Sequence, residues 1–139
     1  WWAYKYEVND AIPYNAALLT HAGVNTAINS DDAEMGRRLN QEAAKMIKYG
    51  NVSQEEAWKS ITLNPAKMLH IDAHVGSLKK NKDADIVVWS SNPLSMSSIV
   101  ERTYIDGRCY FSVEKDLEHR LRLKKDKAML LNKLSINQQ

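Results

Sequence analysis

The sequence predicts an α/β protein in which a helix-rich first half is followed by short strands and a charged helical tail. Three observations predict this class. Apolar residues recur at helical spacing in the first half, a run of β-branched residues and an Asp-Gly turn come next, and charged residues dominate after residue 113. Hydrophobic residues make up 44% of the 139 residues and charged residues 26%, which is the composition of a globular protein.

Composition also limits the classes of partner. The net charge is +2, so neither nucleic acid nor an anionic membrane surface is expected as a partner. No apolar stretch reaches the roughly 18 residues of a membrane span. The single cysteine, Cys109, excludes an internal disulfide and indicates no compartment. The sequence begins without methionine, and we expect it to be a piece of a longer protein.

The first elements are a helix and a short strand. Pro13 suits the first turn of a helix that runs to about His21, and Gly23 suits its end. Residues 24–29 are then predicted to form a short strand, and residues 31–36 a loop.

Further helices follow this loop. Apolar residues recur at helical spacing over residues 38–49, and Gly50 is expected to stop that helix. Ser53 and Glu56 form the pattern of a capping box, which predicts a second helix through Leu63.

The Asn-Pro pair at residues 64–65 is expected to break the second helix, and residues 65–70 to form another short one. Residues 76–83 are rich in turn-forming types, and residues 86–89 are expected to be a buried strand. Two more strands are predicted at 99–105 and 108–113, because Asp-Gly between β-like runs favours a tight hairpin.

From residue 114 onward the sequence predicts a charged helix with an imperfect apolar stripe. Basic residues gather in this segment, but acidic residues interleave with them. A solvated helix face therefore explains the pattern better than a nucleic-acid site does.

Three stretches together resemble the amidohydrolase superfamily, closest to its imidazolonepropionase-like branch. Residues 22–31 resemble the last barrel strand, which ends in a metal-binding aspartate. Residues 53–69 are similar to the helix after that strand, with its Thr-x-Asn-Pro-Ala signature. Residues 75–88 resemble the Gly-Ser run through which the chain returns to a small β domain, although Asn81 stands at a usual glycine position.

The resemblance implies the C-terminal part of a (β/α)8 metal-dependent hydrolase barrel, with strands of a small composite β-sandwich and a C-terminal helix. Residues 1–72 would be barrel, 73–113 sandwich strands and 114–139 the charged helix. It also implies one or two divalent metal ions, zinc being expected, and hydrolysis of a C–N bond through a metal-activated water.

Asp31 is the one site residue that the resemblance places here, as metal ligand and catalytic residue. Alternation within residues 24–31 agrees with this, because Asp31 would point to the barrel interior at the strand's end, while Asp32 is one residue out of phase. The alternative interpretation is that Asp31 and Asp32 only end the strand and cap the next segment.

Other residues offer weaker candidates. The four histidines (His21, His70, His74 and His119) are not expected to bind metal. His70 and His74 are four residues apart, as on one helix face, but that helix is expected to end at residues 71–72. The histidine ligands implied by the resemblance would come from earlier strands. Four aromatic residues near the start (Trp1, Trp2, Tyr4 and Tyr6) could line a substrate pocket or pack in a core. Substrate-binding residues are not otherwise indicated.

We therefore expect the longer parent to be an enzyme that acts on a small-molecule amide, and this chain alone to be inactive with its metal absent or incompletely bound. We also expect the isolated chain to self-associate or to pack on the missing barrel part. The alternative is a non-catalytic scaffold or interaction module that shares the superfamily's C-terminal sequence.

Overall fold

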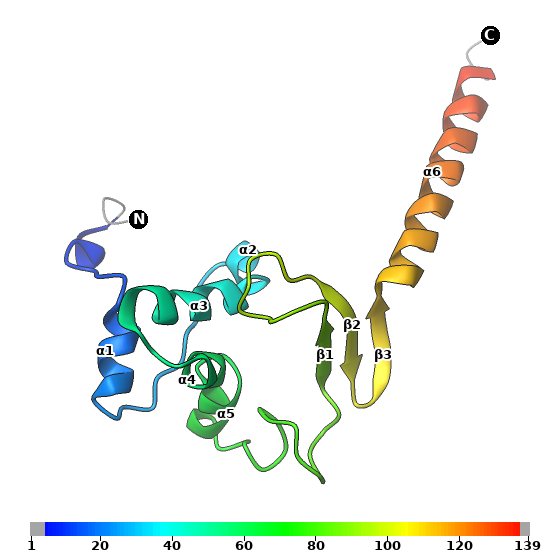
Figure 1. Ribbon diagram of the computed structural model, residues 1–139. Helices are drawn as coiled ribbons and strands as arrows, with labels where there is room; N and C mark the ends of the chain where they lie inside the picture. Colours follow the sequence, from blue (N-terminus) through cyan, green and yellow to red (C-terminus); the bar gives the residue numbers. More distant parts are fainter. Residues whose placement is uncertain (1–4, 137–139) are drawn as a thin grey trace. The chain divides into compact units, whose positions relative to one another are not determined.

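A computed structural model describes residues 5–136 of the chain (Figure 1). Two compact units emerge from the contacts. The first comprises the described residues up to 83 together with Ser91–Ile99, and the second comprises Ala84–Ser90 together with residues 100–136. No helix among the described residues is long and apolar enough to cross a membrane.

The first unit is helical, as the spacing of its apolar residues predicts. Its elements in chain order are η1 (Tyr6–Val8), α1 (Asn15–His21), α2 (Ala33–Gly36), α3 (Leu39–Gly50), α4 (Gln54–Lys59) and α5 (Leu63–Met68). The predicted helices at 13–21 and 38–49 are thus confirmed with small shifts in their ends.

Small side chains let the helices of this unit approach closely. The core cluster consists of Ala17, Met46, Val52 and Ala57, each at most 4% exposed. Gly50 lies where α3 meets α1, and a Cβ built on it would stand 1.9 Å from the Cβ of Ala17. The glycine expected to stop the helix is therefore its last residue and a packing contact, and Asn51 takes the left-handed conformation that ends α3 (φ 53°).

Local signals fix α4 and α5. Ser53 is the N-cap of α4, and its hydroxyl accepts a hydrogen bond from the Glu56 backbone N–H at 3.2 Å. The expectation that this helix continues through Leu63 is wrong, because α4 ends at Lys59. Pro65 does not break a helix either, since it lies in the first turn of α5, where its missing N–H costs nothing.

Two other expectations for the first unit are wrong. Residues 24–29 are extended but belong to no strand, because no ladder partner for them lies among the described residues. Residues 31–36 are not simply a loop, since α2 begins at Ala33. Its N-cap is Asp32, whose carboxylate supplies the acceptors that the first helical N–H groups need.

The second unit contains one antiparallel sheet in the order β1 (Ile86–Trp89), β2 (Val100–Ile105) and β3 (Arg108–Ser112). Asp106 and Gly107 form the turn of the β2–β3 hairpin, with φ of 50° and 75°. Both central residues of such a turn need positive φ, which glycine adopts without steric cost. The predicted strands at 86–89, 99–105 and 108–113 and the hairpin between the last two are confirmed with small shifts in their ends, and the chain has the α/β character expected of it.

β1 is less buried than the sequence predicts. Val87 is 44% exposed and Val88 is 37% exposed. The expectation of a buried strand is thus wrong for the described residues, because the two neighbouring valines point to opposite faces of the sheet and neither face is fully covered by these residues.

The predicted charged helix is confirmed as α6 (Val113–Ile136), which continues directly from β3. At its first turn, Arg102 on β2 forms an ion pair with Glu114 at 3.2 Å. The leucines of its apolar stripe are more than half exposed: Leu117, Leu121, Leu123, Leu130, Leu131 and Leu134.

Candidate functional site

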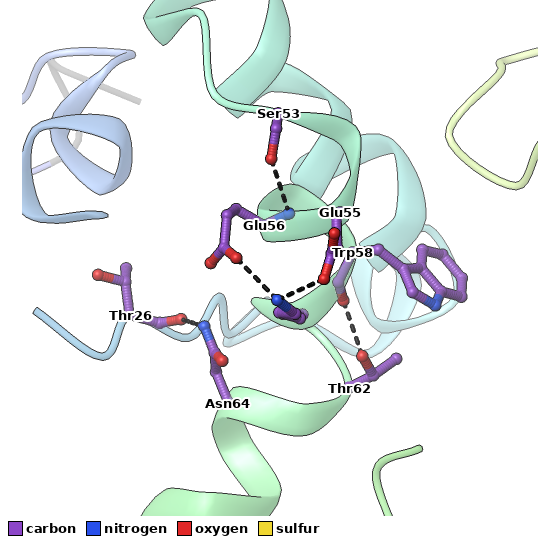
Figure 2. A network of polar contacts seen from close by, with 8 residues as sticks. Thr26, Ser53, Glu55, Glu56, Trp58, Thr62 and Asn64 are labelled. Carbon is purple, nitrogen blue, oxygen red and sulfur yellow. Dashed lines mark hydrogen bonds and ion pairs between the residues drawn. The ribbon is translucent and has the colours of Figure 1, made fainter. Parts of the chain in front are cut away.

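The segment that carries the candidate aspartate is the extended stretch of residues 24–32 between α1 and α2. It is attached to the helices that follow α3. The backbone N–H of Ile28 donates to the Ser60 carbonyl oxygen at 3.0 Å. The side-chain amide of Asn64 donates to the Thr26 carbonyl oxygen at 2.9 Å (Figure 2). The extended backbone is therefore held by the helical layer.

A network of polar contacts around α4 fixes the start of α5 (Figure 2). The Lys59 ammonium pairs with Glu55 at 2.6 Å and with Glu56 at 2.8 Å. Hydrogen bonding from Lys59 lowers the pKa of the exposed Glu55 carboxyl. The Thr62 hydroxyl donates to the Trp58 carbonyl oxygen at 2.9 Å, which ties the connection between the two helices to the last turn of α4.

The extended segment has two different faces. Thr26 is 7% exposed, and Ile28 packs half-buried against the core cluster. Asn25, Asn29 and Asp31 are exposed. Thr26 and Ile28 thus follow the predicted alternation, but Val24, which was expected on the same face, does not, because it is 50% exposed.

Asp31 ends this segment in an unusual backbone conformation. Its φ is 48°, and its N–H donates to the Asn29 side-chain oxygen at 3.2 Å. Within the described part of the chain, no hydrogen bond or ion pair engages its carboxylate. A non-glycine residue held at positive φ is a feature that clusters at functional sites.

Asp32 has a different role from its neighbour. Its Oδ1 accepts hydrogen bonds from the backbone N–H groups of Glu34 and Met35, both at 2.8 Å. Asp32 therefore caps α2, whereas Asp31 has no part in that cap. The capping alternative holds for the second aspartate and leaves the carboxylate of the first one available.

Asp31 has the chemistry of a metal ligand but stands alone. An ionised carboxylate is an acceptor with two oxygens, and it suits hard and borderline divalent cations. Among residues 5–136 no group of three or more histidine, cysteine, aspartate or glutamate side chains could hold a metal ion.

The histidines are not gathered at Asp31. His21 Nε2 lies 2.8 Å from the Gly50 carbonyl oxygen, which ties α1 to the end of α3. His70, His74 and His119 are exposed on separate segments. Of the aromatic candidates, Tyr6 is 92% exposed, while Trp1, Trp2 and Tyr4 lie outside the described residues.

Sequence reasoning missed the residues that hold the extended segment. Asn64 and Ser60 make that attachment, yet neither was singled out for it. The available signal is the Thr-x-Asn-Pro pattern at residues 62–65, which the sequence analysis interprets as a helix break and as part of the family resemblance but not as an attachment. An asparagine just before a proline, one turn after a buried serine, is the feature that could have indicated it.

Comparisons with known proteins agree on one family. The model of the amidohydrolase family matches residues 13–110. Amidohydrolase tasK of Hapsidospora irregularis is 33% identical over 109 residues, which cover 78% of this chain and 11% of that protein. The imidazolonepropionase of Picrophilus torridus is 30% identical over 101 residues, which cover 67% of this chain and 26% of that protein.

Solved structures give the same result. The crystal structure of an amidohydrolase from Thermotoga maritima matches with a TM-score of 0.73 and 38% identity, over 78% of this chain and 28% of that one. A second amidohydrolase crystal structure matches in fold, with a TM-score of 0.62 and 22% identity, over 76% of this chain and 27% of that one. This chain thus spans between 11% and 28% of the length of each of these proteins.

Proposed function

Since this chain belongs to the amidohydrolase family, we propose that it is the C-terminal part of a metal-dependent hydrolase of C–N bonds, in which Asp31 is a metal ligand and a proton acceptor. The observation that carries the proposal is the exposed Asp31 carboxylate, which ends an extended segment and is not engaged by the described residues. The family and the names of the relatives support a hydrolase as the parent.

The parent in this proposal is a (β/α)8 barrel with a small β-sandwich. Residues 24–31 would be a barrel strand that finds its ladder partners in the rest of the parent, and β1 to β3 would be completed by further sandwich strands. The unladdered segment and the exposed valines of β1 support this, because extended backbone and sheet edges need partners.

The chemistry assigned to this chain lies in one side chain. A divalent metal, zinc in our proposal, would polarise a water so that it becomes nucleophilic near neutral pH. Asp31 would contribute a negative oxygen to hold the cation and would accept a proton at a carboxylate oxygen as the water attacks a small-molecule amide. Its exposure on the polar face leaves both oxygens accessible for these tasks.

Two further expectations belong to the proposal. This chain alone would be inactive, because residues 5–136 hold no group of three candidate ligands. A non-catalytic scaffold is disfavoured, since the matched relatives carry the names of enzymes.

The test compares two neighbouring substitutions in the full-length parent. Asp31→Asn should lower kcat at least about a hundredfold, because asparagine keeps the shape but carries no charge and accepts no proton. Asp32→Asn should change kcat little, since asparagine caps a helix about as well as aspartate does. Equal losses in both variants would contradict the assignment of roles, and full activity of Asp31→Asn would refute the mechanism.

A further inference from the structure

We propose that Asn64 is a positioning residue, whose side-chain amide fixes the extended segment so that Asp31 is held at the correct place. This inference rests on the proposed function, because it gives the Thr-x-Asn-Pro pattern a role in the same site. It concerns the backbone that carries Asp31 and not the reacting atoms, so Asn64 itself touches neither metal nor substrate.

Asn64 makes two of the polar contacts between the extended segment and the helices. Its Nδ2 donates to the Thr26 carbonyl oxygen at 2.9 Å, and its backbone oxygen lies 3.4 Å from Nδ2 of Asn25. The other two such contacts of residues 24–28 are the bond from the Ile28 N–H to the Ser60 oxygen and the bond from the Val24 N–H to the Leu19 oxygen on α1, both at 3.0 Å. Asn64 thus takes part in two of these four contacts of the described residues, and Figure 2 shows the one that its side-chain amide makes with Thr26.

The support of Asn64 is itself rigid. It lies in the first turn of α5, next to Pro65, whose ring restricts the backbone. Thr62, the N-cap of α5, donates its hydroxyl proton to the Trp58 oxygen. The amide therefore extends from a helix start that is hydrogen-bonded to the last turn of α4.

In the proposed barrel, the hydrogen bonds from the helices to residues 24–28 would act perpendicular to the sheet, a direction that neighbouring strands do not fix. Ladder hydrogen bonds from adjacent strands hold a strand within the plane of its sheet. The contacts from Asn64 and Ser60 instead set the spacing between the strand and the helices that cover it. Misplacement of a reacting group by about 1 Å can cost about a hundredfold in rate, so loss of this spacing should reach Asp31.

The chain offers a matched control for this role. Asn40 on α3 donates its side-chain amide to the Pro93 carbonyl oxygen at 2.7 Å, and Asn40 is 8% exposed. Asn64→Asp and Asn40→Asp thus remove the same kind of bond within one unit, and each places a carboxylate against a carbonyl oxygen. Only the first of them touches residues 24–31.

Three measurements on the full-length protein separate positioning from general stability. Amide hydrogen exchange over residues 24–31 reports the attachment, competition with a chelator reports zinc affinity, and steady-state kinetics separate kcat from KM. For Asn64→Asp we expect faster amide exchange in residues 24–31 and a lower kcat with little change in KM. We also expect zinc binding to be about tenfold weaker, which is the low end for loss of a residue that orients a metal ligand.

Asn40→Asp should lower the melting temperature without any of these three changes. If Asn64→Asp does not fold, Asn64→Ser removes the amide without adding a charge and replaces it in all three measurements. Exchange over residues 24–31 that matches the Asn40→Asp protein would overturn the proposal.

The failure of this proposal differs from the failure of the proposed function. If Asn64→Asp speeds amide exchange but leaves zinc affinity and kcat unchanged, the positioning role is overturned. Loss of activity in Asp31→Asn would in that case still uphold the proposed function. Full activity of Asp31→Asn would instead overturn the proposed function, whatever Asn64→Asp does.

Discussion

Replacing Gly50 with alanine should destabilise the protein, although alanine is normally the better helix former. Gly50 is the last residue of α3, and its Cα faces Ala17 of α1. A Cβ there would stand 1.9 Å from the Ala17 Cβ and 3.5 Å from the Ala17 Cα. Ordinary carbon contacts lie at about 3.5–4.0 Å, so α1 and α3 would have to separate by roughly 2 Å.

The size of the effect follows from two opposing terms. Alanine in place of glycine favours a helix by about 0.5–1 kcal/mol. Overpacking of a well-filled core costs about 1–3 kcal/mol. Relaxation is difficult because the obstructing atom is a backbone-attached methyl on the 1% exposed Ala17, not the end of a flexible side chain. We expect a net loss of about 1–2 kcal/mol in the free energy of unfolding.

Chemical denaturation of the protein measures this loss, and Gly36→Ala is the matched control. Gly36 is also the last residue of a helix, but a Cβ there would meet only the Ser30 hydroxyl at the ordinary distance of 3.5 Å. Gly36→Ala should therefore be neutral or slightly stabilising. A second substitution, Ala17→Gly, should offset part of the loss in Gly50→Ala. Equal stability of the two glycine variants would refute the packing argument.

Two other predictions follow from the contacts. Lys82 donates hydrogen bonds to the oxygens of Asp72, Val75 (3.0 Å) and Ser77 (2.8 Å). Lys82→Met should therefore lower the free energy of unfolding by about 1–3 kcal/mol and speed amide exchange over residues 72–82. Lys79→Met, at an exposed lysine, is the control and should do neither. The isolated chain should self-associate through its exposed apolar side chains, and a monomer in light scattering at high concentration would contradict this.

The helices and the hairpin could be predicted because their signals are local. The serine cap at Ser53 and the positive-φ pair at residues 106–107 act within a few residues of chain, and the structure contains both. Helix ends were predicted less well. Gly50 carries the signal of a helix stop, yet its contact with Ala17 is a tertiary fact that no local pattern contains.

The two strand errors share one physical cause. Residues 24–29 alternate apolar and polar residues as a strand does, and β1 is an apolar run of the kind found in strands covered on both faces. Composition reports the environment for which a segment is suited, whereas strand assignment and burial depend on the partners that are present. Among the described residues these partners are lacking, so one segment is extended without a ladder and the other has two valines exposed.

The candidate site shows the same limit. Alternation along residues 24–31 predicted that Asp31 would point away from the helices, and it is exposed there. The distinct role of Asp32 as a cap was weighed only as an alternative for both aspartates. The support from Asn64 could not be derived from periodicity, because it joins residues that are 38 positions apart.

The backbone around Asp31 explains how a lone carboxylate can be held ready. The left-handed conformation of Asp31 costs about 1–2 kcal/mol, and a cap such as that of Asp32 on α2 contributes about 1 kcal/mol. The cap and the bond from the Asp31 N–H to Asn29 thus offset the strain on either side of it. Because these contacts do not use the Asp31 carboxylate, a cation that binds it in the proposed site would displace none of the contacts that set its conformation. The residues that flank Asp31 therefore stabilise the turn without engaging its carboxylate within the described part of the chain.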